Sequence, residues 1–401
     1  MTRWTRLTLC LAGAVLTVAS CQNDNSVGPT DPGASEAGTA LATTTTAPLA
    51  FAQVNVGPYH SCGVTTDHRA YCWGGNFSGQ LGDGTTTNRS RPVAVLGGLQ
   101  FLNVDPGTNH TCGVTTDFRA YCWGENATGT LGDGTTIDRP IPAPVAGAHP
   151  FRQVSAGYSS TCGVTRGGHA FCWGWNFVGQ LGDGKTTESH IPEEVRGGFT
   201  WLEVNVSVNY ACGVTTDYRA YCWGENGYSE LGDGTSTNRW RPTAVAGGLS
   251  FRQISPGDRH ACGVTTDYRA YCWGLNIANE LGDGTNNFGR ATPGPVAGGI
   301  KFRRVSAGDG SHVCAITTGG RGYCWGTDEK GALGAGSTKR SSRPVAVLGG
   351  LYFKDLATGE DHTCGRTSAD KAYCWGDNQL GALGDGTTTN RSTPRAVVGP
   401  M

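Results

Sequence analysis

Residues Ala211–Gly224 read ACGVTTDYRAYCWG, and the same fourteen letters return unchanged at Ala261–Gly274. Variants of this stretch recur every 50 or 51 residues from Phe51 onward, which gives seven units. The units begin at Phe51, Phe101, Phe151, Trp201, Phe251, Phe302 and Phe353. Each runs from its aromatic residue through Cys-x9-Cys-Trp-Gly and Leu-Gly-x-Gly to a segment that contains Pro. A period of this length is typical of solenoids and propellers, so each unit is one structural repeat.

Four short segments of the first unit have the character of β-strands: 51–56, 60–65, 70–74 and one around 91–95. The 64 Gly and only 2 Met of the chain also favour short strands joined by turns over helices. Four antiparallel strands form one propeller blade, and seven blades can close into a ring. We therefore predict an all-β, seven-bladed β-propeller of four-stranded antiparallel blades. The C-terminal strand, within 394–398, is expected to join the sheet of the first unit and close the ring.

The repeat resembles that of the regulator of chromosome condensation (RCC1) family. The family pattern is a His near the second strand, Tyr-x-Trp-Gly in the third strand and Gly-x-Leu-Gly-x-Gly after it. In the first unit these are His60, Tyr71-Cys72-Trp73-Gly74 and Gly79-Gln80-Leu81-Gly82-Asp83-Gly84, and the pattern covers 51–401. The resemblance implies a propeller. It also implies one of two activities, nucleotide exchange on a small GTPase or, as in some bacterial members, binding and inhibition of β-lactamases outside the cytoplasm.

The first residues have the layout of an export signal. Arg3 and Arg6 precede the apolar run 7–19, which is too short to span a bilayer and ends in Val18-Ala19-Ser20-Cys21. This ending resembles a bacterial lipobox, which implies removal of 1–20 and a lipid on the Cys21 sulfur. A soluble secreted protein with an incidental cysteine is the alternative.

The segment 21–50 follows as a lipidated cysteine and a tether. It is rich in Thr, Ala, Gly and Pro and offers little apolar surface to bury, so we expect a disordered spacer. Gln22, and not Asp, follows the cysteine. We therefore expect an exported protein that is anchored by lipid at the cell envelope, on the outer membrane if the cell has one.

Each of the 16 cysteines can be assigned to the signal peptide, to the lipid site or to a pair. Cys10 leaves with the signal peptide, Cys21 takes the lipid, and the other fourteen form one pair per unit. Within a unit the two cysteines stand five residues on either side of the hairpin turn, so they oppose each other on one face and can form a disulfide. The pairs are Cys62 and Cys72, Cys112 and Cys122, Cys162 and Cys172, Cys212 and Cys222, Cys262 and Cys272, Cys314 and Cys324, and Cys364 and Cys374.

Metal binding is the less favoured interpretation of the repeated polar residues. Zinc sites use four ligands and shorter cysteine spacings. A histidine recurs two residues before the first cysteine in five units, where it is more often a partner of buried loop carbonyls than a ligand. The Asp-Gly turns that follow Leu-Gly in six units lack the ladder of ligands that calcium needs. We expect no metal and no cofactor.

The loops that follow Trp-Gly differ between units, whereas the hairpin tips repeat. The loops 57–60 and 75–90 are expected on one face of the ring and the tips 66–69 on the other. Units three to five place apolar residues in the variable loops, and an exposed cluster of this kind marks a protein-binding surface. Packing between blades is the alternative for some of them. The residues are Trp175, Phe177, Val178, Tyr228, Leu275 and Ile277, with Tyr158 and Tyr210 beside them.

We therefore predict a protein-binding scaffold that acts outside the cytoplasm, for example as an inhibitor of another exported protein. A net charge of −1 gives no reason to expect nucleic acid as a partner, and the membrane is expected to be reached through the lipid alone. No catalytic constellation stands apart from the repeat, so we do not expect an enzyme. Guanine-nucleotide exchange is one alternative, and a propeller lyase or hydrolase is a second, less favoured one.

Overall fold

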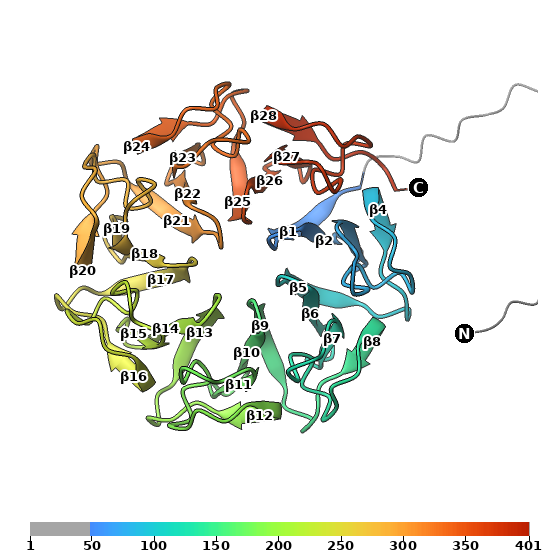
Figure 1. Ribbon diagram of the computed structural model, residues 1–401. Coiled ribbons are helices and arrows are strands. Elements are labelled where there is room, and N and C mark those ends of the chain that lie inside the picture. Colours follow the sequence, from blue (N-terminus) through green and yellow to red (C-terminus); the bar gives the residue numbers. More distant parts are fainter. Residues whose placement is uncertain (1–48, 401) are drawn as a thin grey trace, which may run out of the picture. The chain divides into compact units, whose positions relative to one another are not determined.

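The computed structural model describes residues 49–400. Seven four-stranded sheets surround a central axis, and the first strand of each sheet is the innermost (Figure 1). The fold is therefore the all-β, seven-bladed propeller that the repeat predicts. The expectations for the signal peptide, Cys21 and the tether up to residue 48 lie outside the described residues.

Each blade takes its four strands from consecutive segments, and neighbouring strands pair antiparallel. Blades one and two contain β1 (Phe51–Val56), β2 (His60–Thr65), β3 (Ala70–Gly74), β4 (Arg89–Ala94), β5 (Phe101–Pro106), β6 (His110–Thr115), β7 (Ala120–Gly124) and β8 (Arg139–Pro144). Blades three and four contain β9 (Phe151–Ala156), β10 (Ser160–Thr165), β11 (Ala170–Gly174), β12 (Ser189–Glu194), β13 (Trp201–Val206), β14 (Tyr210–Thr215), β15 (Ala220–Gly224) and β16 (Arg239–Ala244).

The last three blades keep the same order. They contain β17 (Phe251–Pro256), β18 (His260–Thr265), β19 (Ala270–Leu275), β20 (Gly289–Pro295), β21 (Phe302–Ala307), β22 (His312–Thr317), β23 (Gly322–Gly326), β24 (Ser341–Ala346), β25 (Phe353–Thr358), β26 (His362–Thr367), β27 (Ala372–Gly376) and β28 (Arg391–Ala396). In the first unit three predicted strands match the observed ones residue for residue, and the fourth begins slightly earlier, at Arg89.

Each blade packs the face that carries its cysteines against the aromatic face of the next blade. Between blades one and two, Cys62, Cys72 and Leu81 contact Phe101 and Trp123. The Trp123 indole nitrogen donates to the Gln80 carbonyl oxygen at 2.9 Å, which satisfies a polar group that is fully buried. Gly82 lies against the same indole with φ +72°, and a Cβ there would stand 2.7 Å from its nitrogen. Only glycine fits at this point of the repeat.

The ring closes in a different way from the one predicted. β28 pairs with β27 in blade seven and not with β1, so the C-terminal strand does not join the sheet of the first unit. Blade one is already complete because β4 supplies its outer strand. The two end blades instead meet face to face, with Phe51 and Trp73 packed against Cys364, Cys374 and Leu383.

Side chains on the inner strands satisfy the free edge of the neighbouring blade. Gln53 on β1 donates through Nε2 to the Val104 carbonyl oxygen at 3.1 Å, and its Oε1 accepts from the Val104 amide at 2.9 Å. Gln153 and Gln253 bond to the next blade in the same way. An open row of backbone groups at the axis is thereby avoided.

Candidate functional site

The variable loops and the repeated hairpin tips lie on opposite faces of the ring. In blade one the Gly75 amide donates to the Tyr59 carbonyl oxygen at 2.9 Å, so the loop 57–59 and the loop 75–88 lie together. At the opposite end of the strands, the His68 carbonyl oxygen accepts from the Phe101 amide at 2.8 Å. The predicted division into two faces is thus correct. We call the face with 57–59, 75–88 and their counterparts the loop face, and the other the tip face.

Three of the apolar residues expected on the loop face are exposed there. Phe177 is 73% exposed, Ile277 59% and Tyr228 38%, and they belong to the adjacent blades three, five and four. Trp175 is half-buried and its ring stacks on that of Phe177, with centroids 6.1 Å apart. Arg259 lies over the Tyr228 ring at 4.9 Å, which places a cation beside the aromatic surface.

Two other residues of the expected cluster are buried. Leu275 is 5% exposed because β19 extends by one residue to pair with β20. Tyr210 is 1% exposed and donates its hydroxyl to the His260 carbonyl oxygen at 2.5 Å. Leu275 and Tyr210 are therefore packing residues and not part of the surface. Of the remaining two, Tyr158 is exposed and Val178 is half-buried.

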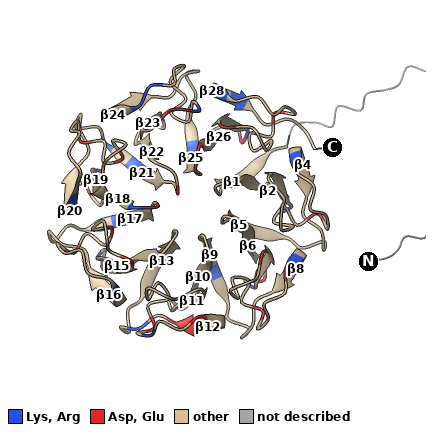
Figure 2. Ribbon diagram, viewed as in Figure 1, with Lys and Arg blue, Asp and Glu red and all other residues tan. Residues whose placement is uncertain are grey.

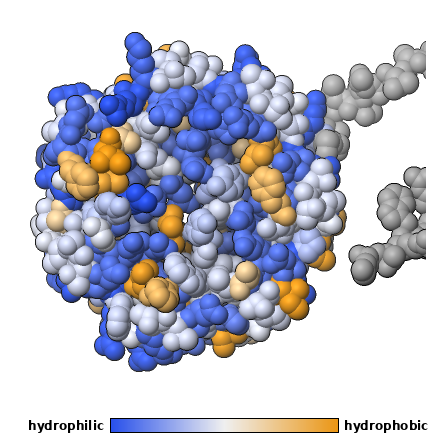
Figure 3. Space-filling model, viewed as in Figure 1, coloured by the Kyte–Doolittle hydropathy of each residue, from blue (hydrophilic) through white to orange (hydrophobic). Residues whose placement is uncertain are grey.

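Sequence reasoning missed further exposed aromatic residues in the same loops. Phe77 stands at the place in blade one that Phe177 takes in blade three, and it is more than half exposed. Phe288 belongs to a loop lengthened by one residue, and its carbonyl oxygen accepts from the Asn276 amide. The alignment of Gly-Asn-Phe in unit one with Trp-Asn-Phe in unit three was the signal that could have found Phe77. Figure 3 shows that apolar atoms gather in separate patches on a mostly hydrophilic face of the ring.

Carboxylates gather in the loops near the axis. Burial, and then repulsion from Asp361, raise the pKa of Glu360. Burial raises the pKa of Asp258; Arg259 opposes this shift and Glu225 adds to it. Glu230 has a pKa raised to about 7 by burial, with Glu225 and Asp258 adding to the shift. These carboxylates repel one another, so the loop face carries a concentrated negative charge.

Basic residues occupy the opposite end of the inner strands. Arg152, Arg252, Arg303 and Lys354 follow directly after the aromatic residue that opens β9, β17, β21 and β25 (Figure 2). This end lies beside the hairpin tips, as the bond from the Phe101 amide to His68 shows for blade two. These four side chains add positive charge to the tip face, where the hairpin tips themselves carry paired charges such as Asp67 and Arg69.

A polar cavity of about 180 Å³ lies on the axis, lined by the inner strands. Burial raises the pKa of Asp105 and of Glu203 to about 7. At the loop face Asp309 reaches from blade six to blade four, where its Oδ1 accepts from the Ser207 hydroxyl at 2.8 Å. This bond joins two blades that are not neighbours, through a residue that helps to line the cavity.

The recurrent histidines hold blades together. His110 Nε2 lies 2.9 Å from Thr161 Oγ1 of the next blade, and Thr161 donates to the Thr130 carbonyl oxygen. Burial lowers the pKa of His110 to about 4, so the ring is neutral at neutral pH. The same kind of contact with a hydroxyl of the next blade recurs at His60, His312 and His362.

The cysteines are scaffold. Seven disulfides join the two cysteines of each unit, with Cα atoms 4.0–4.1 Å apart. All fourteen cysteines are fully buried, so none of them faces a partner. The bridges join the predicted pairs, which are Cys62 and Cys72, Cys112 and Cys122, Cys162 and Cys172, Cys212 and Cys222, Cys262 and Cys272, Cys314 and Cys324, and Cys364 and Cys374.

The Asp-Gly turns are scaffold as well. Their aspartates are neutralised by their own loops, as where Arg89 lies 2.8 Å from Asp83. Among residues 49–400 no cluster of three or more His, Cys, Asp or Glu side chains suits a metal. Nor does any helix in that range have the length and apolar character to cross a bilayer.

The repeat, the seven blades and the divergent loop face define a class of propeller. Residues 6–310 match the RCC1-like domain, and 319–365, 353–382 and 370–401 match the RCC1 repeat. Because the first match spans more than half of the chain, the chain belongs to the RCC1-like family. The resemblance stated from the repeat is thereby confirmed.

Solved structures of this class share the fold. Human WBSCR16 is 21% identical with a TM-score of 0.75, over 83% of this chain and 94% of that one. Yeast RCC1 (Prp20), solved bound to Kap60, is 19% identical with a TM-score of 0.74, over 87% and 85%. The ectodomain of the Arabidopsis thaliana receptor kinase ACR4 is 21% identical with a TM-score of 0.52, over 79% and 90%. These likenesses show the fold alone.

Proposed function

We propose that this chain is an exported, lipid-anchored scaffold that binds another protein through its loop face. The observation that carries the proposal is the exposure of Phe177, Tyr228 and Ile277 on three adjacent blades. By contrast, the hairpin Ala211–Gly224 of blade four returns letter for letter at Ala261–Gly274 of blade five. Packing cannot account for divergent residues that point to solvent, and large exposed apolar side chains are typical anchors of protein interfaces.

The charge of the loop face supports a positively charged partner. Asp258, Glu225 and Glu360 are acidic residues of the loop face; burial raises the pKa of Asp258 and of Glu360, and neighbouring carboxylates add to both shifts. A partner with Lys or Arg around an apolar protrusion would match both features. Such charges speed association and select the partner, and the buried apolar contacts supply most of the affinity.

The disulfides support export. Thiols are kept reduced in the cytoplasm, whereas seven disulfides in one chain suit an oxidising compartment. This favours the binding scaffold over nucleotide exchange on a small GTPase. Lipidation at Cys21 remains a prediction from sequence, and inhibition of the bound protein is one form that the activity can take.

The test is capture of the partner from envelope extract by the purified mature chain. The triple variant Phe177→Ala/Tyr228→Ala/Ile277→Ala is expected to lose at least tenfold in captured partner, because hot-spot side chains each contribute about 2 kcal/mol or more. Capture should also fall as salt rises, since part of the attraction is between charges.

The matched control removes exposed aromatic residues from the tip face of the same blades. Tyr218→Ala/Tyr268→Ala deletes two rings that are 46% and 39% exposed. This control is expected to capture as much as the wild type. Equal capture by the triple variant and the wild type, or a loss confined to the tip-face variant, would reject the loop face as the site.

A further inference from the structure

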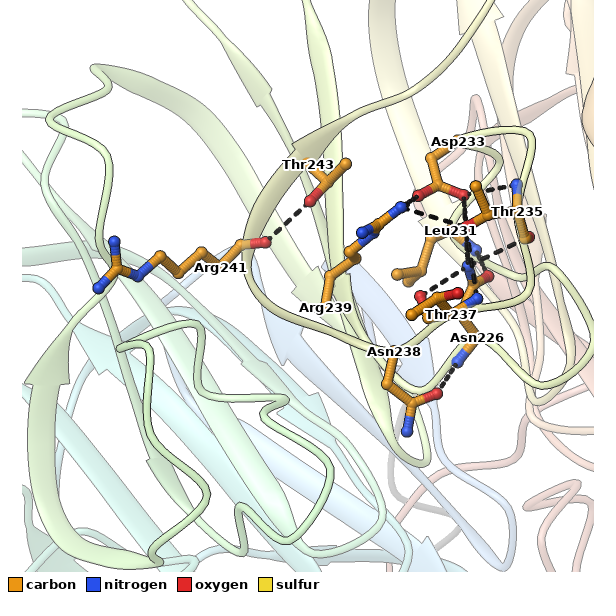
Figure 4. Close-up of polar contacts among 9 residues, drawn as sticks. All are labelled: Asn226, Leu231, Asp233, Thr235, Thr237, Asn238, Arg239, Arg241 and Thr243. Atoms are coloured by element: carbon orange, nitrogen blue, oxygen red, sulfur yellow. Dashed lines mark hydrogen bonds and ion pairs between the residues drawn. The ribbon is translucent and has the colours of Figure 1, made fainter.

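An asparagine organises the long loop of most blades by placing its amide group among oxygen atoms (Figure 4). In blade four, Asn226 Nδ2 donates to Asp233 Oδ1 at 3.3 Å and to the carbonyl oxygens of Thr235 and Thr237 at 3.2 and 3.0 Å. Its Oδ1 accepts from the Leu231 amide at 3.0 Å. The same set of bonds recurs at Asn76, Asn126, Asn176 and Asn378.

Blade six keeps this loop but has Asp328 in place of the asparagine. Asp328 Oδ1 accepts from the Leu333 amide at 2.9 Å, as the asparagine oxygen does elsewhere. Gly331, Gly334 and Gly336 have φ angles of 89°, 66° and 75°, close to the 79°, 72° and 76° of their counterparts in blade one. The backbone of the loop is therefore the same.

The second oxygen of Asp328 takes the place where the other blades have an NH₂ group. Asp328 is 1% exposed, and no hydrogen-bond donor among residues 49–400 reaches its Oδ2. By the spacing of the other blades, the carbonyl oxygens that surround this position belong to Ser337 and Lys339. Oxygen atoms without a proton between them repel one another, so a positive centre is required.

The loop does not supply that centre from its own buried side chains. In five other blades the turn aspartate pairs with an arginine, as Arg239 does with Asp233 at 2.8 Å, and in blade three it pairs with Lys185. Blade six has Ala335 and Ser341 at these two positions. In blade six the carboxylate of the loop is therefore that of Asp328, and no arginine stands at the position of Arg239. The side chains of Lys339 and Arg340 are exposed.

We propose that blade six binds a hard metal cation between Asp328 Oδ2 and the carbonyl oxygens of Ser337 and Lys339. All the ligands are oxygen atoms, which suits Ca²⁺ or Na⁺ and excludes preference for a soft metal. Water completes the coordination on the partly exposed side of Ser337. With a single carboxylate the affinity for Ca²⁺ is weak, with a Kd on the order of 10⁻⁴–10⁻³ M, which is the range of extracellular modules.

Thermal unfolding of the full chain tests the site. The reference buffer contains a chelator and choline chloride, and CaCl₂ or NaCl then replaces choline at constant ionic strength. The wild-type Tm is expected to rise by about 2–4 °C at saturation, because the cation binds the folded chain alone. The salt whose effect on Tm saturates at the lower concentration, CaCl₂ or NaCl, identifies the ion. Isothermal titration with Ca²⁺ gives the number of sites directly.

Asp328→Asn is the decisive variant, because it installs the residue that the six other blades carry. It is expected to fold, to match or exceed the Tm of the loaded wild type, and to lose the cation response. Asp361→Asn removes the same charge from a neighbouring loop and should keep the response in full.

Two outcomes would overturn the site. An equal cation response in the wild type and in Asp328→Asn would place the ion elsewhere. A wild-type Tm that ignores both cations and rises only on acidification would mean that a proton fills the gap, since burial raises the pKa of Asp328 to about 6.

Discussion

The indole nitrogen of Trp73 donates a hydrogen bond to the Ala382 carbonyl oxygen at 2.9 Å, across the boundary between blades one and seven. The six other boundaries have the same bond at 2.8–2.9 Å. The Phe51 amide also donates to the Asp370 carbonyl oxygen at 2.8 Å, as the Phe101 amide does to His68. The first and last blades therefore meet as any two neighbours do, and the ring needs no shared strand.

If closure uses ordinary contacts, the tryptophan at the closing boundary should matter as much as one inside the ring. Trp73→Phe and Trp223→Phe are each expected to lower the free energy of unfolding by about 2–4 kcal/mol, because each loses a buried hydrogen bond and leaves a cavity. Denaturant unfolding measures both. A clearly smaller loss for Trp73→Phe would mean that the closing boundary contributes less than the others.

Glu203 is a half-buried acid that lines the axial cavity, at a position where three other blades carry glutamine. Its Oε1 accepts from the Ile254 amide at 2.7 Å, and burial raises its pKa to about 7. A raised pKa means that ionisation disfavours the folded chain, so the cost appears as pH rises above the ordinary value and is complete above pH 7. Glu203→Gln is therefore expected to raise stability at pH 8 by about 1–3 kcal/mol and to change little at pH 4.

Thermal unfolding as a function of pH measures this difference. Gln253→Glu provides the reverse change at the equivalent position of blade five, where Gln253 bonds to Val305 on both sides. It should introduce the loss of stability at high pH that Glu203→Gln removes. A pH-independent effect of Glu203→Gln would show that packing, and not ionisation, is responsible.

The strands were predictable because the register of each hairpin is set by its cysteines. Cys62 opposes Cys72 and Val64 opposes Ala70, so a shift by one residue would move the cysteines to the wrong face. The repeat then extends this register to all seven blades. Closure was not predictable in the same way, because a strand at the end of the chain can pair with either end blade without any change in local sequence.

The binding surface was predictable only in part. Phe177 and Ile277 are exposed as expected, but Leu275 is buried by a lengthened strand that no local pattern signals. Asp328 is visible in the sequence as a departure from the repeat. The proposal that it binds a cation depends on carbonyl oxygens that only the folded loop brings around it.

The disulfides should stabilise blades independently of one another. Cys212 and Cys222 close a loop with a sequence separation of 10. In the chain-entropy model such a bridge contributes about 2.8 kcal/mol at most, and less in a hairpin that is already local. Cys212→Ala/Cys222→Ala is expected to fold and to lose about 1–2 kcal/mol of unfolding free energy. Mass spectrometry of the non-reduced variant should find the other six bridges intact, and scrambled pairing would contradict this independence.

Leu275 and Ile277 are two residues apart, and we expect substitution of the first to reduce stability and substitution of the second to reduce binding. Leu275 is 5% exposed, so Leu275→Ala is expected to cost about 2–5 kcal/mol through the cavity that it leaves. Ile277 is 59% exposed, so Ile277→Ala should change stability by no more than about 0.5 kcal/mol while it weakens capture of the partner. Unfolding and capture assays on the two variants should therefore give opposite rankings. If Leu275→Ala weakened capture without loss of stability, the side chain would have to reach the surface in solution.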